Sequence, residues 1–177
     1  ELISSNILID PSLYVHYQND DFLIVNKPNG IAVHSGTNQK HDFLSSLKVS
    51  ENLKDLSLVN RLDKNTSGCL LIAKNYRSSS YLGKELMNRN IIKKYFALLT
   101  GRLKKNIIEI EARIIKDAKN KKMIIDNSTG DDAYTKIKLI KQFQSHCLVE
   151  IEIKTGRTHQ IRLHAASIGH PVAGNRK

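Results

Sequence analysis

The first half of the chain alternates between short apolar runs and polar segments. Residues 22–26 form an apolar run that leads into Lys27-Pro28-Asn29-Gly30, a sequence typical of a turn, and a second apolar run follows at 31–34. We therefore expect a strand, a turn and a strand. The same pattern returns at 57–60 and 69–74, where two apolar runs flank a polar segment. This pattern predicts a polar loop between two buried strands.

The second half is richer in strands. Residues 76–90 place Tyr81, Leu82, Leu86 and Met87 at helical spacing, which predicts an amphipathic helix. A second helix is expected at 158–168, with Thr158 as its N-cap and with His159 and Arg162 brought toward one region. Four runs alternate with a period of two, as half-exposed antiparallel strands do, and they cover 93–101, 107–115, 133–143 and 147–155.

These elements predict an α+β fold in which a largely antiparallel sheet dominates. The length of 177 residues suits one domain over residues 1–177, and neither an internal repeat nor a Pro- or Gly-rich linker divides it. Cys69 and Cys147 lie inside apolar runs, so we expect buried, reduced thiols and no disulfide. No apolar run is long enough to cross a bilayer, and the sequence indicates a cytoplasmic protein without a membrane partner.

The charge balance is strongly positive. Lys and Arg number 28 against 17 Asp and Glu, which gives a formal net charge of +11. A surplus of this size is typical of proteins that bind a polyanion, and nucleic acid is the leading class of partner. A lysine-rich solvated surface is the alternative, and charge alone does not decide between the two.

Two polar segments concentrate chemically active side chains. Residues 61–68 (RLDKNTSG) place an acid, two cations and a glycine in a loop between apolar strands. Residues 155–164 (TGRTHQIRLH) crowd two arginines and two histidines at a strand-to-helix junction, where amides and guanidinium groups favour anions. Taken singly, the first segment is more often an ordinary polar turn, and the second is more often a solvated, basic helix start.

Together, and in this order, the two segments resemble the RluA/RluC-type pseudouridine synthases, whose hallmarks are an RLDxxTSG loop and a downstream GRTHQIR segment. Residues 93–97 (KKYFA) resemble the K-x-Y-x-A strand of that family, and IVNKPNGIAVH resembles its KPxG element. The resemblance extends from about Tyr17 to the end of the chain. It implies a mixed, largely antiparallel central sheet flanked by helices, with a basic active-site cleft that takes a flipped nucleotide.

The resemblance also implies roles for individual residues. Asp63 is expected to be the catalytic aspartate, Tyr95 to stack on the target base, and Arg162 to pair with Asp63. Arg61 is expected to help displace the base from its helix. The remaining expected contacts to substrate or RNA are Leu62, Thr66, Gly68, Lys94, Arg157, His159, Gln160 and Leu163.

The chemistry of the reaction agrees with these roles. The bond between C1′ and N1 of uracil must break before the base rejoins through C5, and an ionised carboxylate beside the sugar can act as nucleophile or as base. An arginine near Asp63 would favour the ionised carboxylate. The isomerisation requires no metal, nucleotide or redox cofactor, and we expect none. A metal site is also not expected because the histidines have no acidic or thiol partners at the spacing of metal ligands.

Some expectations concern substrate and chain ends. Asn60 precedes the RLD sequence where many family members have His. Residues 1–12 are interpreted as a linker from an absent S4-like domain, and the chain is expected to be truncated at its C-terminus. The expected substrate is structured RNA, with large-subunit ribosomal RNA first and transfer RNA second, modified by a monomer.

Three other functions stay open at this point. The first is a non-catalytic RNA-binding protein on the same fold, and the second is a glycosidase or nuclease that uses Asp63 together with another acid. A DNA-binding regulator is a weaker alternative, because no helix-turn-helix or zinc-finger pattern emerges.

Overall fold

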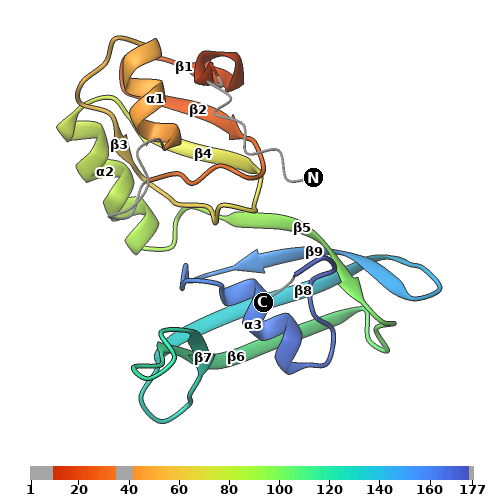
Figure 1. The fold of residues 1–177 in the computed structure, drawn as a ribbon. Coiled ribbons are helices and arrows are strands. Elements are labelled where there is room, and N and C mark those ends of the chain that lie inside the picture. The colour runs from red at the N-terminus through yellow and green to blue at the C-terminus, as the bar shows by residue number, and fades with distance from the viewer. Residues whose placement is uncertain (1–9, 35–41, 176–177) are drawn as a thin grey trace. The chain divides into compact units, whose positions relative to one another are not determined.

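The computed structural model describes residues 10–34 and 42–175. They divide into two compact units, residues 1–88 and 89–177, each with its own antiparallel sheet (Figure 1). The α+β class is therefore confirmed. The prediction of one domain over residues 1–177 stays a prediction, and the predicted linker at 1–12 lies mostly outside the described residues.

The first unit holds a four-stranded sheet with the order β1-β2-β4-β3. Its elements are η1 (Pro11–Tyr14), β1 (Val15–Gln18), β2 (Phe22–Lys27), α1 (Phe43–Ser50), β3 (Ser57–Leu58), β4 (Gly68–Ala73) and α2 (Tyr76–Met87). The two strands predicted around the polar segment are confirmed as β3 and β4, which pair antiparallel. The segment therefore bridges two neighbouring strands.

Burial in the first unit follows the alternation along β2. Leu23, Val25 and Lys27 lie on the buried face of this strand, and each has an exposed fraction of 0%. Leu70 and Ile72 of β4 complete the same core and are also fully buried. Side chains of a strand alternate between its two faces, so Lys27 lies on the same buried face as Leu23 and Val25.

The second unit holds a five-stranded sheet with the order β5-β9-β8-β6-β7. Its elements are β5 (Lys93–Thr100), β6 (Ile107–Lys116), β7 (Met123–Ile125), β8 (Asp131–Gln142), β9 (His146–Ile153) and α3 (Gln160–Ser167). The four predicted strands are confirmed as β5, β6, β8 and β9. The helix α3 packs on this sheet (Figure 1). Its Ala165 joins a buried cluster that includes Leu99, Ile137, Val149 and Ile151.

Three local predictions were wrong. Residues 31–34 form no strand, because the carbonyls of Ala32 and Val33 accept hydrogen bonds from the first amides of α1 instead. Cys69 is exposed, since it alternates with the buried Leu70 along β4, whereas Cys147 is buried as expected; both thiols are free. The N-cap of α3 is His159 and not Thr158.

The predicted helix at 76–90 is confirmed as α2, but only part of its expected apolar stripe is sheltered, because Leu82 and Leu86 are half-buried. Tyr81 and Met87 are 62% and 82% exposed, and the buried residue is Ser78. The Ser78 hydroxyl donates a 2.7 Å hydrogen bond to the carboxylate of Asp21, and its amide donates to the Asn75 side chain at 2.8 Å. The first turn of α2 is thus held by polar contacts.

Candidate active site

The loop that carries Asp63 begins as an extension of the sheet. The Val59 amide donates to the Leu71 carbonyl at 3.0 Å, and the Asn60 side chain accepts from the Leu71 amide at 2.8 Å. Asn60 also donates to the Cys69 carbonyl at 3.3 Å. The side chain of Asn60 therefore continues the pairing with β4, and the chain leaves the sheet only after this residue.

A turn follows at Asp63. The Asp63 carbonyl accepts a 3.0 Å hydrogen bond from the Thr66 amide, and the Asp63 side chain is half-buried. Leu62 beside it is only 9% exposed and packs as a core residue. Gly68, which ends the loop, has a φ of 119°, a backbone conformation that favours glycine. The loop is paired with β4 through Val59 and Asn60 at its start and enters β4 at Gly68, so the carboxylate is held in a restricted position.

A buried lysine lies beneath this turn. The ammonium group of Lys27 donates to the carbonyls of Pro28 at 2.8 Å, Ile31 at 2.9 Å and Lys64 at 3.3 Å. The Lys64 carbonyl also accepts from the Gly30 amide at 2.9 Å. The turn at 27–30 and the Asp63 loop are therefore joined through one cation and one backbone bond. Sequence reasoning placed a turn here but missed Lys27 itself.

Burial changes the ionisation of this lysine. Removal of the ammonium group from water lowers the pKa of Lys27 from 10.5 to about 8, and the negative charge of Asp63 opposes this shift. The carboxylate is thus close enough to act electrostatically on the buried cation. An ionised carboxylate at this position is the form that can act as nucleophile or base.

Tyr95 lies on β5 in the second unit. It is half-buried and packs against the cluster around Leu99 and Ile151. Lys94 points to the opposite face of the strand, where it forms a 3.5 Å ion pair with Glu150. Lys93 lies on the same face of β5 as Tyr95. Sequence reasoning missed it, although the spacing of two residues between them already indicated a shared face.

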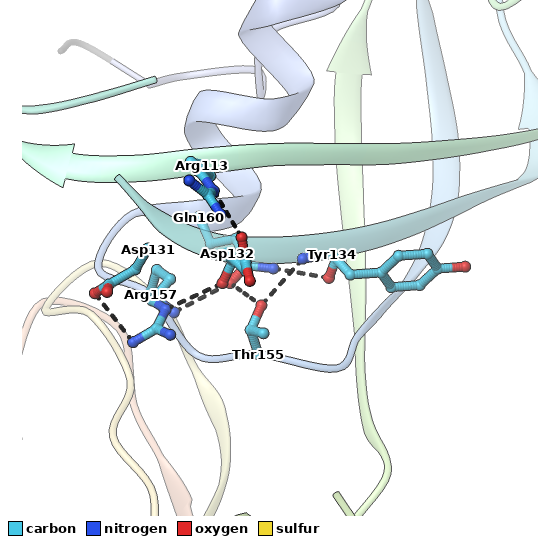
Figure 2. A network of polar contacts seen from close by, with 7 residues as sticks. All are labelled: Arg113, Asp131, Asp132, Tyr134, Thr155, Arg157 and Gln160. Carbon is cyan, nitrogen blue, oxygen red and sulfur yellow. Dashed lines mark hydrogen bonds and ion pairs between the residues drawn. The ribbon is translucent and has the colours of Figure 1, made fainter. Parts of the chain in front are cut away.

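Lys93 contacts the second polar segment. Its ammonium group donates to the Thr155 carbonyl at 3.2 Å, and partial burial together with the charge of Arg89 lowers the pKa of Lys93. Arg157 forms a 3.2 Å ion pair with Asp131 and donates to the Asp132 carbonyl at 3.2 Å (Figure 2). The strand-to-helix junction is therefore attached to both β5 and β8.

Helix α3 begins with an unusual residue. His159 has a φ of 58°, in the left-handed region that few residues other than glycine adopt, and its side chain makes no capping bond. Gln160 follows and is only 2% exposed, so direct contact with RNA would require the protein to open there. Arg162 donates a 2.7 Å hydrogen bond to the Asn175 side chain.

The predicted site residues fall into two groups. The structure brings Arg61, Leu62, Asp63, Thr66 and Gly68 together in one loop of the first unit, and Lys94, Tyr95, Arg157, His159, Gln160, Arg162 and Leu163 belong to the second unit. The pairing of Asp63 with Arg162 and the stacking role of Tyr95 stay predictions.

Two general features of the described residues bear on the chemistry. Within 10–34 and 42–175, no group of three or more His, Cys, Asp or Glu side chains is arranged to hold a metal ion. Among the same residues, no helix has the length and apolar character that a membrane crossing requires.

Known proteins resemble this chain in sequence. A family model described as RNA pseudouridylate synthase matches residues 21–167. An uncharacterized RNA pseudouridine synthase of Bacillus subtilis, YlyB, is 35% identical over 97% of this chain and 60% of its own length. The ribosomal large subunit pseudouridine synthase C of Rickettsia prowazekii is 39% identical over 99% of this chain and 58% of its own length.

Solved structures show the same fold. Human RNA pseudouridylate synthase domain containing 4 superposes with a TM-score of 0.80 at 22% identity, over 94% of this chain and 69% of that one. Human RNA pseudouridylate synthase domain containing 1 gives a TM-score of 0.77 at 26% identity, over 91% and 67%. The chain spans about 60% of the length of the two bacterial relatives. By the match of the family model over most of its length, this chain belongs to the RNA pseudouridylate synthase family.

Proposed function

We propose that this chain is the catalytic part of a pseudouridine synthase that isomerises uridine in large-subunit ribosomal RNA. The observation that carries the proposal is the anchored loop around Asp63, with the buried Lys27 bonded beneath it to the Lys64 carbonyl. A non-catalytic RNA-binding protein has no need of a half-buried carboxylate held above a buried cation, because burying such groups is costly.

The reaction assigns a task to each proposed residue. Asp63 acts beside the ribose, as nucleophile or as base, while the bond from C1′ to N1 breaks. The freed base turns and C5 bonds to C1′; C5 loses its proton and N1 gains one, so product and substrate are isomers. Tyr95 stacks on the base, and Arg162 pairs with the Asp63 carboxylate. This isomerisation consumes no cofactor.

The substrate class rests on charge and on the relatives. A net charge of +11 suits a protein that binds the phosphates of RNA, and Arg61, Arg157 and His159 are proposed to contact them or the flipped nucleotide. The Rickettsia relative is named for ribosomal large-subunit RNA, which favours that RNA over transfer RNA here. We expect the enzyme to act in the cytoplasm as a monomer.

The first test replaces the carboxylate. Asp63→Asn keeps the size of the side chain but removes the charge, and the rate of pseudouridine formation should fall at least about 100-fold. Single-turnover assays with large-subunit ribosomal RNA and with transfer RNA, followed by mapping of pseudouridine, measure the effect and identify the substrate. Asp55→Asn, at an exposed position of the same unit, is the matched control and should be as active as the unsubstituted chain.

The outcomes separate the alternatives. Activity on ribosomal RNA alone supports the proposed substrate, and activity on transfer RNA alone replaces it with the second one. Absence of pseudouridine in both RNAs with the unsubstituted chain, while RNA still binds, would favour the non-catalytic RNA-binding role. Full activity of Asp63→Asn would remove Asp63 from the mechanism.

A further inference from the structure

The second unit contains a connected set of buried polar side chains. In the described part of this unit, Thr135, Gln160 and His164 are the polar side chains classed as buried, with exposed fractions of 0%, 2% and 0%. Hydrogen bonds join all three, and we call them the β8–α3 network. Buried polar groups are costly unless they are bonded, so a connected set at this position calls for an explanation.

The orientation of the Gln160 amide follows from its neighbours. Its oxygen accepts from the Arg157 amide at 3.0 Å, a donor that cannot reverse, and from the Thr155 hydroxyl at 2.8 Å (Figure 2). Its nitrogen therefore points the other way and donates to the Tyr134 carbonyl at 2.8 Å and to the Thr135 hydroxyl at 3.0 Å. The four bonds use the full capacity of the amide.

The same bonds favour one position for the proton on His164. Because the Thr135 oxygen accepts from Gln160, its own proton is free to be donated to Nδ1 of His164, 2.9 Å away. Nδ1 is then the acceptor and Nε2 carries the proton. Burial lowers the pKa of His164, which favours this neutral ring. The Ala112 carbonyl lies near enough to influence the ring, although Nε2 forms no well-aligned hydrogen bond.

The network holds the entry to α3. His159 supplies no side-chain cap there, and Gln160 instead binds the Arg157 amide and the Thr155 hydroxyl before the helix begins. Arg162 lies in the same first turn as Gln160. Any shift in the anchoring of Gln160 to β8 therefore moves the backbone that carries Arg162.

We propose that Thr135, Gln160 and His164 are positioning residues that set the start of α3 and thereby the direction of Arg162 in the isomerisation. This inference rests on the proposed function, and it replaces the expectation that Gln160 contacts RNA. The three side chains touch neither substrate nor reacting atoms in this role. They act through the backbone of residues 155–162.

The decisive variant is Thr135→Val, which keeps the shape of the side chain and removes the hydroxyl that links Gln160 to His164. We expect kcat to fall at least tenfold, while the Kd for the RNA changes less than threefold. Thr135→Ser restores the hydroxyl and should keep kcat within about threefold of the unsubstituted chain. Urea unfolding of each variant gives the folded fraction, so that kcat refers to folded protein.

A second measurement does not depend on activity. The nitrogen NMR shifts of His164 should show a proton on Nε2 and an acceptor at Nδ1 in the unsubstituted chain and in Thr135→Ser. In Thr135→Val, the Nδ1 signal should shift because its donor is lost. A proton on Nδ1 in the unsubstituted chain would overturn the proposed donation from Thr135 to His164.

The outcomes also separate this inference from the proposed function. An inactive unsubstituted chain defeats the proposed function itself. An active chain whose Thr135→Val variant loses stability but keeps kcat shows a purely structural network and overturns the inference, as does loss of RNA affinity at constant kcat. If Thr135→Val does not fold, Thr155→Val is the second variant. It removes the hydroxyl that donates to Gln160 and lies at a half-buried position. Its kcat and RNA affinity then test the inference by the same criteria.

Discussion

At the scale of single residues, the ionisation of Lys27 is coupled to the stability of the fold around the loop that carries Asp63. Its pKa of about 8 in the folded chain lies below the ordinary 10.5, so the unfolded chain binds more protons between these two values. The contribution of Lys27 to stability is therefore fully present above pH 10.5 and is lost as the pH falls through about 8. This difference between the two pKa values corresponds to a change of about 3 kcal/mol in the free energy of unfolding.

Lys27→Met tests this linkage. We expect the free energy of unfolding of the unsubstituted chain to rise relative to that of the variant between pH 8 and 10.5, by up to about 3 kcal/mol. Urea unfolding at several pH values measures the difference, and Lys54→Met at an exposed position is the matched control. If the free energy of unfolding depends on pH in the same way for Lys27→Met and the unsubstituted chain, Lys27 titrates normally. Pseudouridine formation should also fall at least about tenfold, because the loop loses its anchor.

At the scale of elements, the turn between β7 and β8 has no room for a side chain at Gly130. A Cβ there would lie 2.7 Å from the Asp126 carbonyl oxygen and 2.9 Å from backbone and side-chain atoms of Arg113. Gly130→Ala should therefore lower the free energy of unfolding by about 1–3 kcal/mol. The amide of Gly130 also donates to that Asp126 carbonyl at 3.0 Å, so a shift would strain the turn.

Gly83→Ala is the matched control for this prediction. Gly83 lies inside α2, and a Cβ added there would meet no atom within 4 Å. Alanine there should raise the free energy of unfolding by about 0.5–1 kcal/mol, since glycine is the poorer helix former. Thermal and urea unfolding of both variants provide the measurement. Equal effects of the two substitutions would contradict the crowding at Gly130.

The elements also show how far the sequence predicts the fold. Period-two alternation is a property of the local chain, and it identified β5, β6, β8 and β9 correctly. The strand predicted from the apolar run at 31–34 did not form, because the backbone acceptors there are used by α1, a partner that no local pattern reveals. The parity of Thr135 with Ala133 and Ile137 already indicated a buried face, but its partners come from α3, 25 residues or more along the chain.

The candidate site was predictable to the same extent. The polar loop with Asp63 and the junction before Arg162 were recognisable as motifs, because their residue types are unusual beside apolar runs. The burial of Lys27 was not, since lysine is rarely buried and only the alternation of β2 indicated its side. Gln160 stood in a polar segment, and its burial depends on tertiary contacts with Tyr134 and Thr135.

At the scale of the whole molecule, the net charge of +11 determines how the chain should meet RNA. Cations that bind phosphates release counterions, and the logarithm of the binding constant falls by about 0.7 to 0.9 per phosphate contact for each unit of log salt. With about four such contacts, an increase in NaCl from about 50 to 200 mM should weaken RNA binding by about 50- to 150-fold. Fluorescence anisotropy with a labelled fragment of large-subunit ribosomal RNA measures this dependence.

The Asp63→Asn variant makes the same measurement a test of roles. Asp63 is proposed to act on the ribose and not on phosphates, so the variant should show the same salt slope as the unsubstituted chain although it forms no pseudouridine. Circular dichroism over the same salt range controls for loss of the fold. A salt-independent affinity would mean that the positive charge is a solvated surface; a slope changed by Asp63→Asn would mean that this carboxylate shapes phosphate binding, which would require a different account of the loop above Lys27.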